Sequence, residues 1–153
     1  MTTATTAPGL EQSPAWSAAL YARVQQFYAR QMQLLDLGEA ERWARTFTED
    51  ATFAVPTLPE PARGRAALAA AARRTAAELA AAGQRHRHFI GMLDVRPRPD
   101  GAVDVRSYAI VYASQTGGAS QVHRVCVCED VLLHQDDGEL RVSARTVTRD
   151  DLA

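Results

Sequence analysis

Two of the four histidines in this chain, His86 and His88, lie two residues apart in the segment from Arg85 to Gly91. In a β-strand, side chains two apart point to the same face. If this segment is a strand bordering a cavity, two imidazoles with pKa values near neutrality enter that cavity. Such groups transfer protons at physiological pH. We therefore interpret His88 as a candidate acid–base residue and His86 as a residue at the edge of its pocket.

A carboxylate beside His88 would complete an acid–base pair. Asp36 stands two residues before Gly38, at the predicted end of a helix, where a negative charge is unfavourable for the helix dipole. This position suggests a role for Asp36 outside the helix. An imidazole paired with a carboxylate could take a proton from an activated C–H group and return it to a departing hydroxyl or to an aldol oxygen.

Other candidates for contact with a substrate follow from strand parity. Tyr108 and Tyr112 share one face of the strand after His88, where a hydroxyl could hydrogen-bond a developing enolate oxygen. His123 and Glu129 share a face of the next strand. Four further residues could line the pocket of a flat substrate, although core packing is the first interpretation of residues of these types at this spacing. They are Tyr28, Trp43, Phe53 and Met92.

Composition excludes several classes of protein. The chain has 153 residues and a formal net charge of −1, which does not fit a nucleic-acid-binding protein. None of its basic residues is lysine, which removes Schiff-base chemistry and a P-loop. We expect no cofactor, no membrane segment and no metal. A metal site at His86 and His88, with His123 or Glu129 as third ligand, is the alternative for this cluster.

The expected organisation is α+β. Apolar spacing predicts a helix from Pro14 to Gly38, a short helix over 39–47 and an alanine-rich helix over 64–82. Strands are predicted at 51–55, 87–96, 102–115, 121–134 and 140–149. The last four are joined by the turn signals Asp100-Gly101, Gly117-Gly118 and Asp137-Gly138, which predict an antiparallel meander.

Residues 1–13 are interpreted as a flexible tail and 14–153 as one domain. Cys126 and Cys128 are two apart, where a disulfide would be strained, so we expect reduced thiols and a cytoplasmic protein. The predicted break over 46–50 places Asp50 in a turn. The arginines at 141, 145 and 149 are expected on an exposed or dimer-facing surface of the sheet.

This order of elements, with the "FTEDATF" entry to the first strand and the "HFIG" segment at His88, resembles the nuclear transport factor 2-like superfamily. Within it the chain is most similar to SnoaL-like polyketide cyclases and, locally, to scytalone dehydratase. The resemblance implies a strongly curved, mostly antiparallel sheet wrapping two or three N-terminal helices, a cone-like barrel with an internal pocket. It also implies that His88 is an acid–base catalyst assisted by Asp36, and that a carboxylate near Glu129-Asp130 takes part.

These inferences predict a cofactor-independent cyclase or dehydratase, a lyase- or isomerase-type enzyme of polyketide or antibiotic biosynthesis. Its substrate would be a small polyketide-derived carbonyl compound, and the protein would be a homodimer. Cyclisation and dehydration stay open, because both begin with the same proton abstraction. The alternative is a non-catalytic binding module, or a scaffolding subunit similar to the small subunits of ring-hydroxylating dioxygenases.

Overall fold

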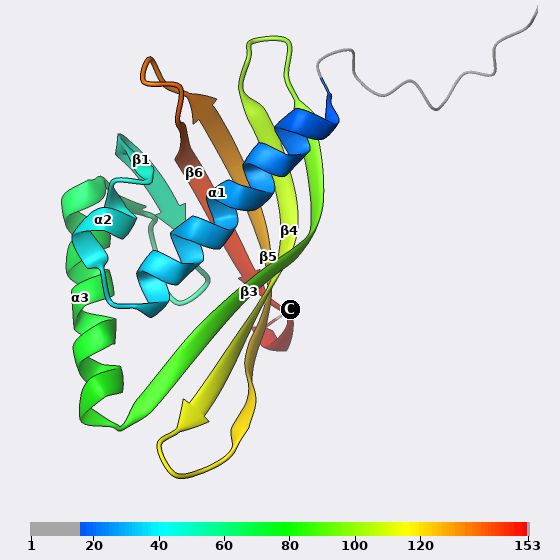
Figure 1. Ribbon diagram of the computed structural model, residues 1–153. Coiled ribbons are helices and arrows are strands. Elements are labelled where there is room, and N and C mark those ends of the chain that lie inside the picture. The colour runs from blue at the N-terminus through cyan, green and yellow to red at the C-terminus, as the bar shows by residue number, and fades with distance from the viewer. Residues whose placement is uncertain (1–15, 153) are drawn as a thin grey trace, which may run out of the picture.

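The computed structural model describes residues 16–152, so the tail predicted at 1–13 and the helix start predicted at Pro14 lie outside the described residues. The described part of the chain forms one curved sheet with helices on one side (Figure 1). Its elements are α1 (Ala18–Asp36), α2 (Ala40–Ala44), β1 (Phe47–Ala54), β2 (Ala62–Arg63), α3 (Arg65–Ala81), β3 (Gln84–Pro97), β4 (Val103–Gln115), β5 (Ser120–His134), β6 (Leu140–Arg149) and a final 3₁₀ turn, Asp150–Leu152.

Helix α1 begins and ends where local chemistry favours it. The Ser17 hydroxyl accepts a hydrogen bond of 3.0 Å from the backbone N–H of Leu20, which caps the helix start. Val24, Tyr28 and Met32, four residues apart, form the buried stripe that packs on the sheet. Gly38, at φ 75°, lets the chain turn sharply after the helix. Asp36 is thereby held in the last turn of α1, next to the sheet.

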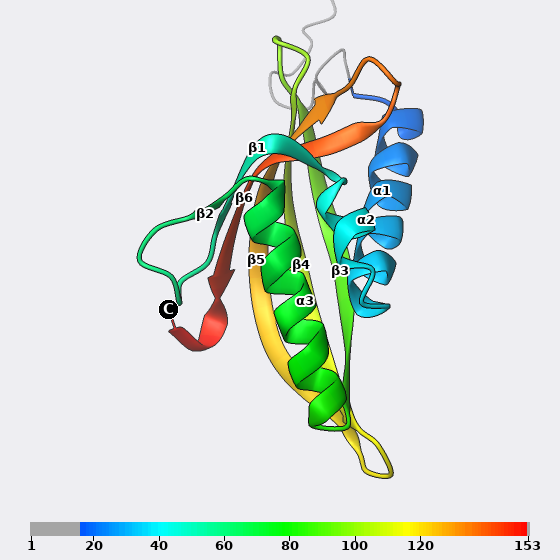
Figure 2. The same ribbon diagram turned by 90° about the vertical axis from the view of Figure 1, so that its left-hand side faces the viewer.

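The sheet has the strand order β2-β1-β6-β5-β4-β3. The four long strands are antiparallel neighbours, as the turn signals predicted, and only β1 and β6 run parallel. The α+β class and the curved sheet are confirmed. The sheet does not close into a barrel, because β2 and β3 remain its edges. Helix α3 contacts both β1 and β3, so it covers the gap that the open sheet leaves (Figure 2).

The first strand begins earlier than its polar sequence suggested. Residues 46–50 were expected to break the chain, yet Phe47 starts β1 and is wholly buried. The centre of its ring lies 4.9 Å from that of the Trp43 ring. The burial of this aromatic side chain outweighs the tendency of the polar residues at 48–50 to form a turn. Strand β2, which pairs Thr52 with Arg63, lies in the proline-rich segment and was not predicted. Two residues carry too little pattern to be recognised.

Bulges interrupt three of the long strands, at Ser143 in β6 and at one point each in β3 and β5, and change which residues face the helices. In β3 the register with β4 shifts between Gly91 and Asp94, so one residue is extra there. In β5 the shift leaves His123 without a partner between Val122 and Arg124. Each bulge inverts the alternation of side chains along its strand, which alters the candidate site.

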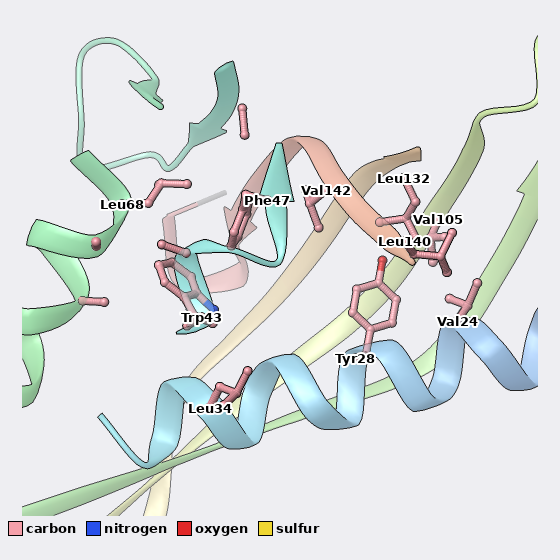
Figure 3. Close-up of a cluster of buried hydrophobic side chains, with 14 of the residues drawn as sticks. Val24, Tyr28, Leu34, Trp43, Phe47, Leu68, Val105, Leu132, Leu140 and Val142 are labelled. Carbon is pink, nitrogen blue, oxygen red and sulfur yellow. The ribbon is translucent and has the colours of Figure 1, made fainter. Parts of the chain in front are cut away.

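The main hydrophobic core lies between the helices and the concave face of the sheet (Figure 3). Val24 and Tyr28 of α1 meet the side chains of β4, β5 and β6, while Trp43, Phe47 and Leu68 fill the end near α3. Among the described residues, the helices all lie on this face (Figure 1). The opposite, outer face of the sheet is therefore not covered by helices.

Candidate active site

Asp36 and His88, 52 residues apart in sequence, are in direct contact. The His88 ring nitrogen Nδ1 lies 2.6 Å from Asp36 Oδ1, and the His88 backbone N–H donates to Asp36 Oδ2 at 3.0 Å. The Asp36 side chain is 7% exposed and that of His88 is 25% exposed. Because a carboxylate in this contact accepts, Nδ1 carries the proton. Nitrogen Nε2 of His88 makes no hydrogen bond to any residue in 16–152, so it is available to a substrate.

His86 and His123 extend this group along the concave face. The His86 ring lies 6.4 Å from that of His88 and 4.8 Å from that of His123, measured between ring centres. Desolvation lowers the pKa of His86, and the neighbouring His123 and His88 lower it further. Desolvation and the charge of Arg124 lower the pKa of His123. Both rings are therefore neutral at pH 7 and could accept or relay a proton.

Three predicted helpers lie on the other face of the sheet. Gly91 and Arg87, the register partners of Tyr108 and Tyr112, belong to the outer face, and both tyrosines are exposed. Glu129 is also exposed and faces outward beside Arg106. The prediction that these residues help His88 is therefore wrong in geometry. On β4 the wrong face was assigned to Tyr108 and Tyr112, whereas on β5 the bulge at His123 places Glu129 on the face opposite to His123.

The four residues predicted to line a pocket have different surroundings. Tyr28 and Trp43 are buried in the core, and Phe53 is partly buried against it. Met92 is 76% exposed with φ 55°, because it stands in the bulge of β3. It shares the parity of His88 but lies beyond the point where the alternation inverts. The structure thus places Met92 outside the site and the aromatic residues in the packing beneath it.

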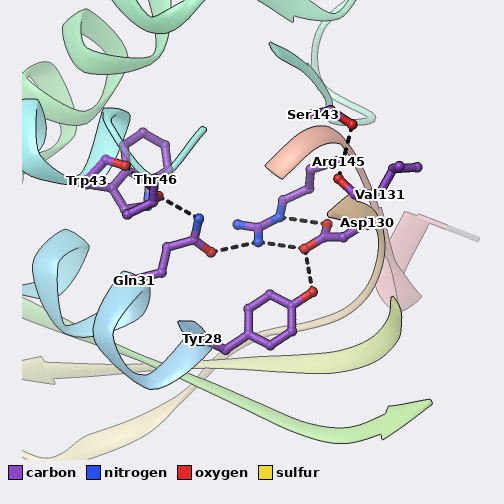
Figure 4. A network of polar contacts seen from close by, with 8 residues as sticks. All are labelled: Tyr28, Gln31, Trp43, Thr46, Asp130, Val131, Ser143 and Arg145. Carbon is purple, nitrogen blue, oxygen red and sulfur yellow. Dashed lines mark hydrogen bonds and ion pairs between the residues drawn. The ribbon is translucent and has the colours of Figure 1, made fainter. Parts of the chain in front are cut away.

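A buried polar network connects α1 with β5 and β6 (Figure 4). Arg145 donates to both oxygens of Asp130, from Nε at 2.8 Å and from Nη2 at 2.7 Å. The Tyr28 hydroxyl donates to Asp130 Oδ2 at 2.8 Å. Arg145 Nη2 also donates to Gln31 Oε1 at 2.7 Å, and Gln31 Nε2 donates to the Thr46 hydroxyl at 2.7 Å. Every member is thereby paired inside the core, as buried polar groups require.

This network corrects the prediction for the arginines of β6. Arg145 is 4% exposed and lies among the rings of Tyr28, Phe47 and Phe53, whereas it was expected on an exposed surface. Burial opposes its charged form, but Asp130 raises the pKa of Arg145 above its ordinary value. Arg141 and Arg149 are half-buried and pair with Asp137 and Asp151. The resemblance implied a carboxylate near Glu129-Asp130, and the structure places Asp130, not Glu129, on the buried face with Cys126 and Cys128.

The two cysteines are buried and unbridged. Burial raises the pKa of Cys128 to about 12 and also raises that of Cys126. Both thiols are therefore protonated at neutral pH. Since the thiolate is the nucleophile, neither side chain is equipped for covalent catalysis.

Two clefts in the described part of the chain lie away from His88. One cleft of about 510 Å³ lies between α1, α2 and the β5–β6 hairpin, and one of about 330 Å³ lies over β4 to β6 around Asp104 and Thr146. Neither includes His88 or Asp36, so neither is the internal pocket that was expected. Two buried atoms, Trp43 Nε1 and Ser107 Oγ, have no partner among residues 16–152. Such atoms usually meet a water or ligand atom.

Metal ligands and membrane helices were both searched within residues 16–152. No group of three or more His, Cys, Asp or Glu side chains in this range is arranged to hold a metal ion. None of the described helices combines the length and the apolar character needed to cross a membrane.

The likeness to known proteins covers nearly the whole described chain. The model of the SnoaL-like domain matches residues 16–146. The chain belongs to the SnoaL-like family. None of the curated proteins searched matches it significantly. The family assignment agrees with the fold, since the matched range includes Asp36, His88 and all six strands up to Thr146 of β6.

Solved structures resemble this SnoaL-like domain over most of their length. ActVI-ORFA from Streptomyces coelicolor is 34% identical, with 88% of this chain and 99% of that chain covered and a TM-score of 0.81. Aln2 from another Streptomyces species is 35% identical, with 89% and 94% covered and a TM-score of 0.82. A protein from Catenulispora acidiphila, solved in complex with S-DNPA, is 36% identical, with 89% and 97% covered and a TM-score of 0.77.

Proposed function

We propose that this SnoaL-like protein is a cofactor-independent cyclase or dehydratase of a polyketide-like carbonyl compound, with His88 as the acid–base residue. The observation that carries the proposal is the double contact of Asp36 with the ring and the backbone of His88. It fixes the ring and its tautomer and leaves Nε2 as a base. The small-molecule complex of the similar Catenulispora protein supports a small organic substrate.

The proposed chemistry begins at a carbon next to a carbonyl group. Nε2 of His88 takes a proton from this carbon, and the electron pair moves onto the carbonyl oxygen as an enolate. Asp36 stabilises the resulting imidazolium. In a dehydration, the enolate expels a β-hydroxyl, which leaves as water with the proton from His88. In a cyclisation, the enolate carbon attacks a second carbonyl, and the new alkoxide receives that proton.

His86 and His123 are proposed to assist as neutral proton carriers at the entrance to this site. Their lowered pKa values keep them uncharged beside His88 at pH 7. The unpaired Trp43 Nε1 and Ser107 Oγ are proposed to meet polar atoms of substrate or ordered water on the helix side of the sheet.

The test is turnover of polyketide-derived β-hydroxyketones and diketones by the wild type and by His88→Ala. We expect the variant to lose about 10²- to 10⁴-fold in kcat. Asp36→Asn is expected to lower kcat with little change in KM, because it disturbs the orientation of a base. The product mass distinguishes the reactions, since dehydration removes one water and cyclisation alone conserves mass.

His134→Ala is the matched control, because His134 is an exposed histidine at the end of β5. Its turnover should equal that of the wild type. Equal turnover by His88→Ala and His134→Ala would remove His88 as the acid–base residue. Binding of these compounds without any conversion by the wild type would favour the alternative of a non-catalytic binding module.

A further inference from the structure

The cleft between α1, α2 and the β5–β6 hairpin concentrates positive charge. Its volume is about 510 Å³. Helix α1 contributes Arg23 and Arg30, the end of α2 contributes Arg42 and Arg45, and β6 contributes Arg141. One acidic residue, Glu139, also lines it. The fold thus brings together five guanidinium groups from three elements, in a chain whose formal net charge is −1. A concave surface lined by one sign of charge attracts the opposite charge.

Three of these arginines have partners that hold them in place. Arg23 Nη2 donates to the carbonyl oxygen of Gly138 in the hairpin turn at 2.8 Å. Arg141 Nη2 lies 2.9 Å from Asp137 Oδ2, and Arg42 lies 3.9 Å from Glu39. These contacts fix the walls of the cleft and neutralise only part of its charge.

Arg30 and Arg45 have no such partner. Within residues 16–152, neither guanidinium group makes a hydrogen bond or an ion pair to another residue. Both line the cleft from opposite elements, α1 and the C-terminal end of α2. A guanidinium group offers paired donors that match a carboxylate or a phosphate, and such charge-assisted hydrogen bonds are the stronger ones. Two free guanidinium groups facing one cleft are therefore suited to hold one anionic group.

The floor of the cleft is apolar. Phe27, Leu34 and Leu140 line it beside the arginines. Leu34 and Leu140 belong to the buried core, so this apolar lining is continuous with it. An apolar floor with a few charged groups at the rim is the usual composition of a small-molecule site, and about 510 Å³ lies within the usual size range of such sites.

We propose that this cleft binds a small organic anion, an aromatic or aliphatic body carrying a phosphate or carboxylate group. Arg30 and Arg45 hold the anionic group, and Phe27, Leu34 and Leu140 hold the apolar body. The site shares no lining residue with the Asp36–His88 pair. The inference is therefore independent of the proposed reaction, and either can fail without the other.

The experiment is calorimetric titration of the full chain at constant ionic strength. The probes are 1-naphthyl phosphate, 1-naphthoate and the neutral 1-naphthalenemethanol. The variants are Arg30→Gln/Arg45→Gln, the single changes, and Arg74→Gln as a matched loss of charge on the exposed face of α3. His88→Ala is added to detect binding at the other site. Thermal unfolding of each variant shows that it is folded, and the single changes replace the double one if that variant is not.

We expect at least one anionic probe to bind the wild type, Arg74→Gln and His88→Ala alike. Loss of two charge-assisted contacts in Arg30→Gln/Arg45→Gln should weaken binding about tenfold or more. The neutral probe should bind similarly weakly to every variant. The tighter of the two anions assigns phosphate or carboxylate as the preferred group.

Three results would overturn the inference. Neither anion binding the wild type up to about 5 mM would show that the cleft is only a solvated surface. Equal weakening in Arg74→Gln and in the double variant would show unspecific charge attraction. Loss of binding in His88→Ala, with no loss in Arg30→Gln/Arg45→Gln, would place the anion at the other site.

Discussion

A carboxylate that accepts from both the backbone and the ring of one histidine restricts that ring to a single orientation. Asp36, in the last turn of α1, makes both of these contacts with His88 of β3. This contact explains why Asp36 stands at a helix end. Its charge is slightly unfavourable for the helix dipole there, but the position lets it orient the His88 ring. The same contact would be lost if α1 were one turn shorter.

The ion pair of Asp130 and Arg145 gives a residue-scale prediction about stability. Asp130→Asn leaves the Arg145 guanidinium buried without its counter-charge, since Arg145 is 4% exposed. We expect a loss of about 3–5 kcal/mol in the free energy of unfolding, the usual cost of breaking a buried pair. Urea unfolding followed by circular dichroism measures it.

Tyr28→Phe is the control for that change, because it removes one hydrogen bond to Asp130 and leaves the ion pair with Arg145 intact. It should cost about 2 kcal/mol, as hydrogen bonds to charged groups do. A double change, Asp130→Leu with Arg145→Met, should recover much of the lost stability by removing both charges. An Asp130→Asn variant as stable as Tyr28→Phe would show that the pair does not support the fold.

At the scale of elements, the bulges decide which residues reach the concave face. Before the bulge of β3, His86, His88 and Ile90 point toward the helices; after it, Leu93 and Val95 do. Met92, inside the bulge, points to solvent. The bulge at His123 in β5 likewise brings that ring beside His86. Without the extra residue, the alternation would continue unchanged, and the apolar side chains after the bulge would point to the outer face.

Met92→Gly tests the bulge of β3. Met92 has φ 55°, a left-handed conformation that costs a side-chain-bearing residue about 1 kcal/mol and glycine nothing. Its side chain is 76% exposed, so little burial is lost. We expect Met92→Gly to leave the free energy of unfolding unchanged or slightly higher, as measured by urea unfolding.

Arg87→Gly is the comparison on the same strand, because Arg87 is exposed and does not have a positive φ. Glycine in an ordinary strand position should cost about 0.5–1 kcal/mol. A larger loss for Met92→Gly than for Arg87→Gly would contradict the strain assigned to the bulge.

At the scale of the whole molecule, the outer face of the sheet carries more than half of the large hydrophobic side chains that are exposed within residues 16–152. The helices of the described residues all pack on the concave face. The outer face carries five large exposed side chains, which a monomer rarely leaves in contact with water. They are Phe89, Tyr108, Tyr112, Val122 and Val125.

We expect a second copy of the chain to cover this face, giving a homodimer. Tyr108→Glu with Val125→Glu places two charges in the centre of the patch and should yield monomers. Light scattering after size exclusion measures the mass, against 16.6 kDa for one chain. Gln33→Glu, an exposed change on α1, should leave the dimer intact. A wild type that is monomeric at about 100 μM would contradict the prediction.

Much of the fold follows from local sequence patterns. Apolar spacing of three and four residues located α1, the helix propensity of alanine located α3, and paired turn residues located the four long strands. These signals are local, because a helix turn or a hairpin turn depends on neighbouring residues. The pairing of His86 with His88 on one face was predictable for the same reason, since no bulge separates them.

The candidate site was predictable only in part. His88 was found by its type and parity and by the resemblance of its "HFIG" segment, and Asp36 by the same resemblance, supported by its unusual place at a helix end. The outward direction of Tyr108, Tyr112 and Glu129 was not predictable, because a strand's parity does not say which of its faces meets the helices. The burial of Arg145 was also missed, because one arginine among alternating residues resembles a surface position until its partner is known.

The sequence by itself determined the three helices and the four long strands, their order, and the residue types able to transfer protons. Each of these depends on contacts within a few residues, which the chain carries locally. Only the tertiary structure decided that Asp36 contacts His88, which lies 52 residues away in sequence. It also decided that Asp130 pairs with Arg145 and that five arginines line one cleft. Those outcomes depend on sheet curvature, on bulges and on the packing of α1, which are properties of the whole fold.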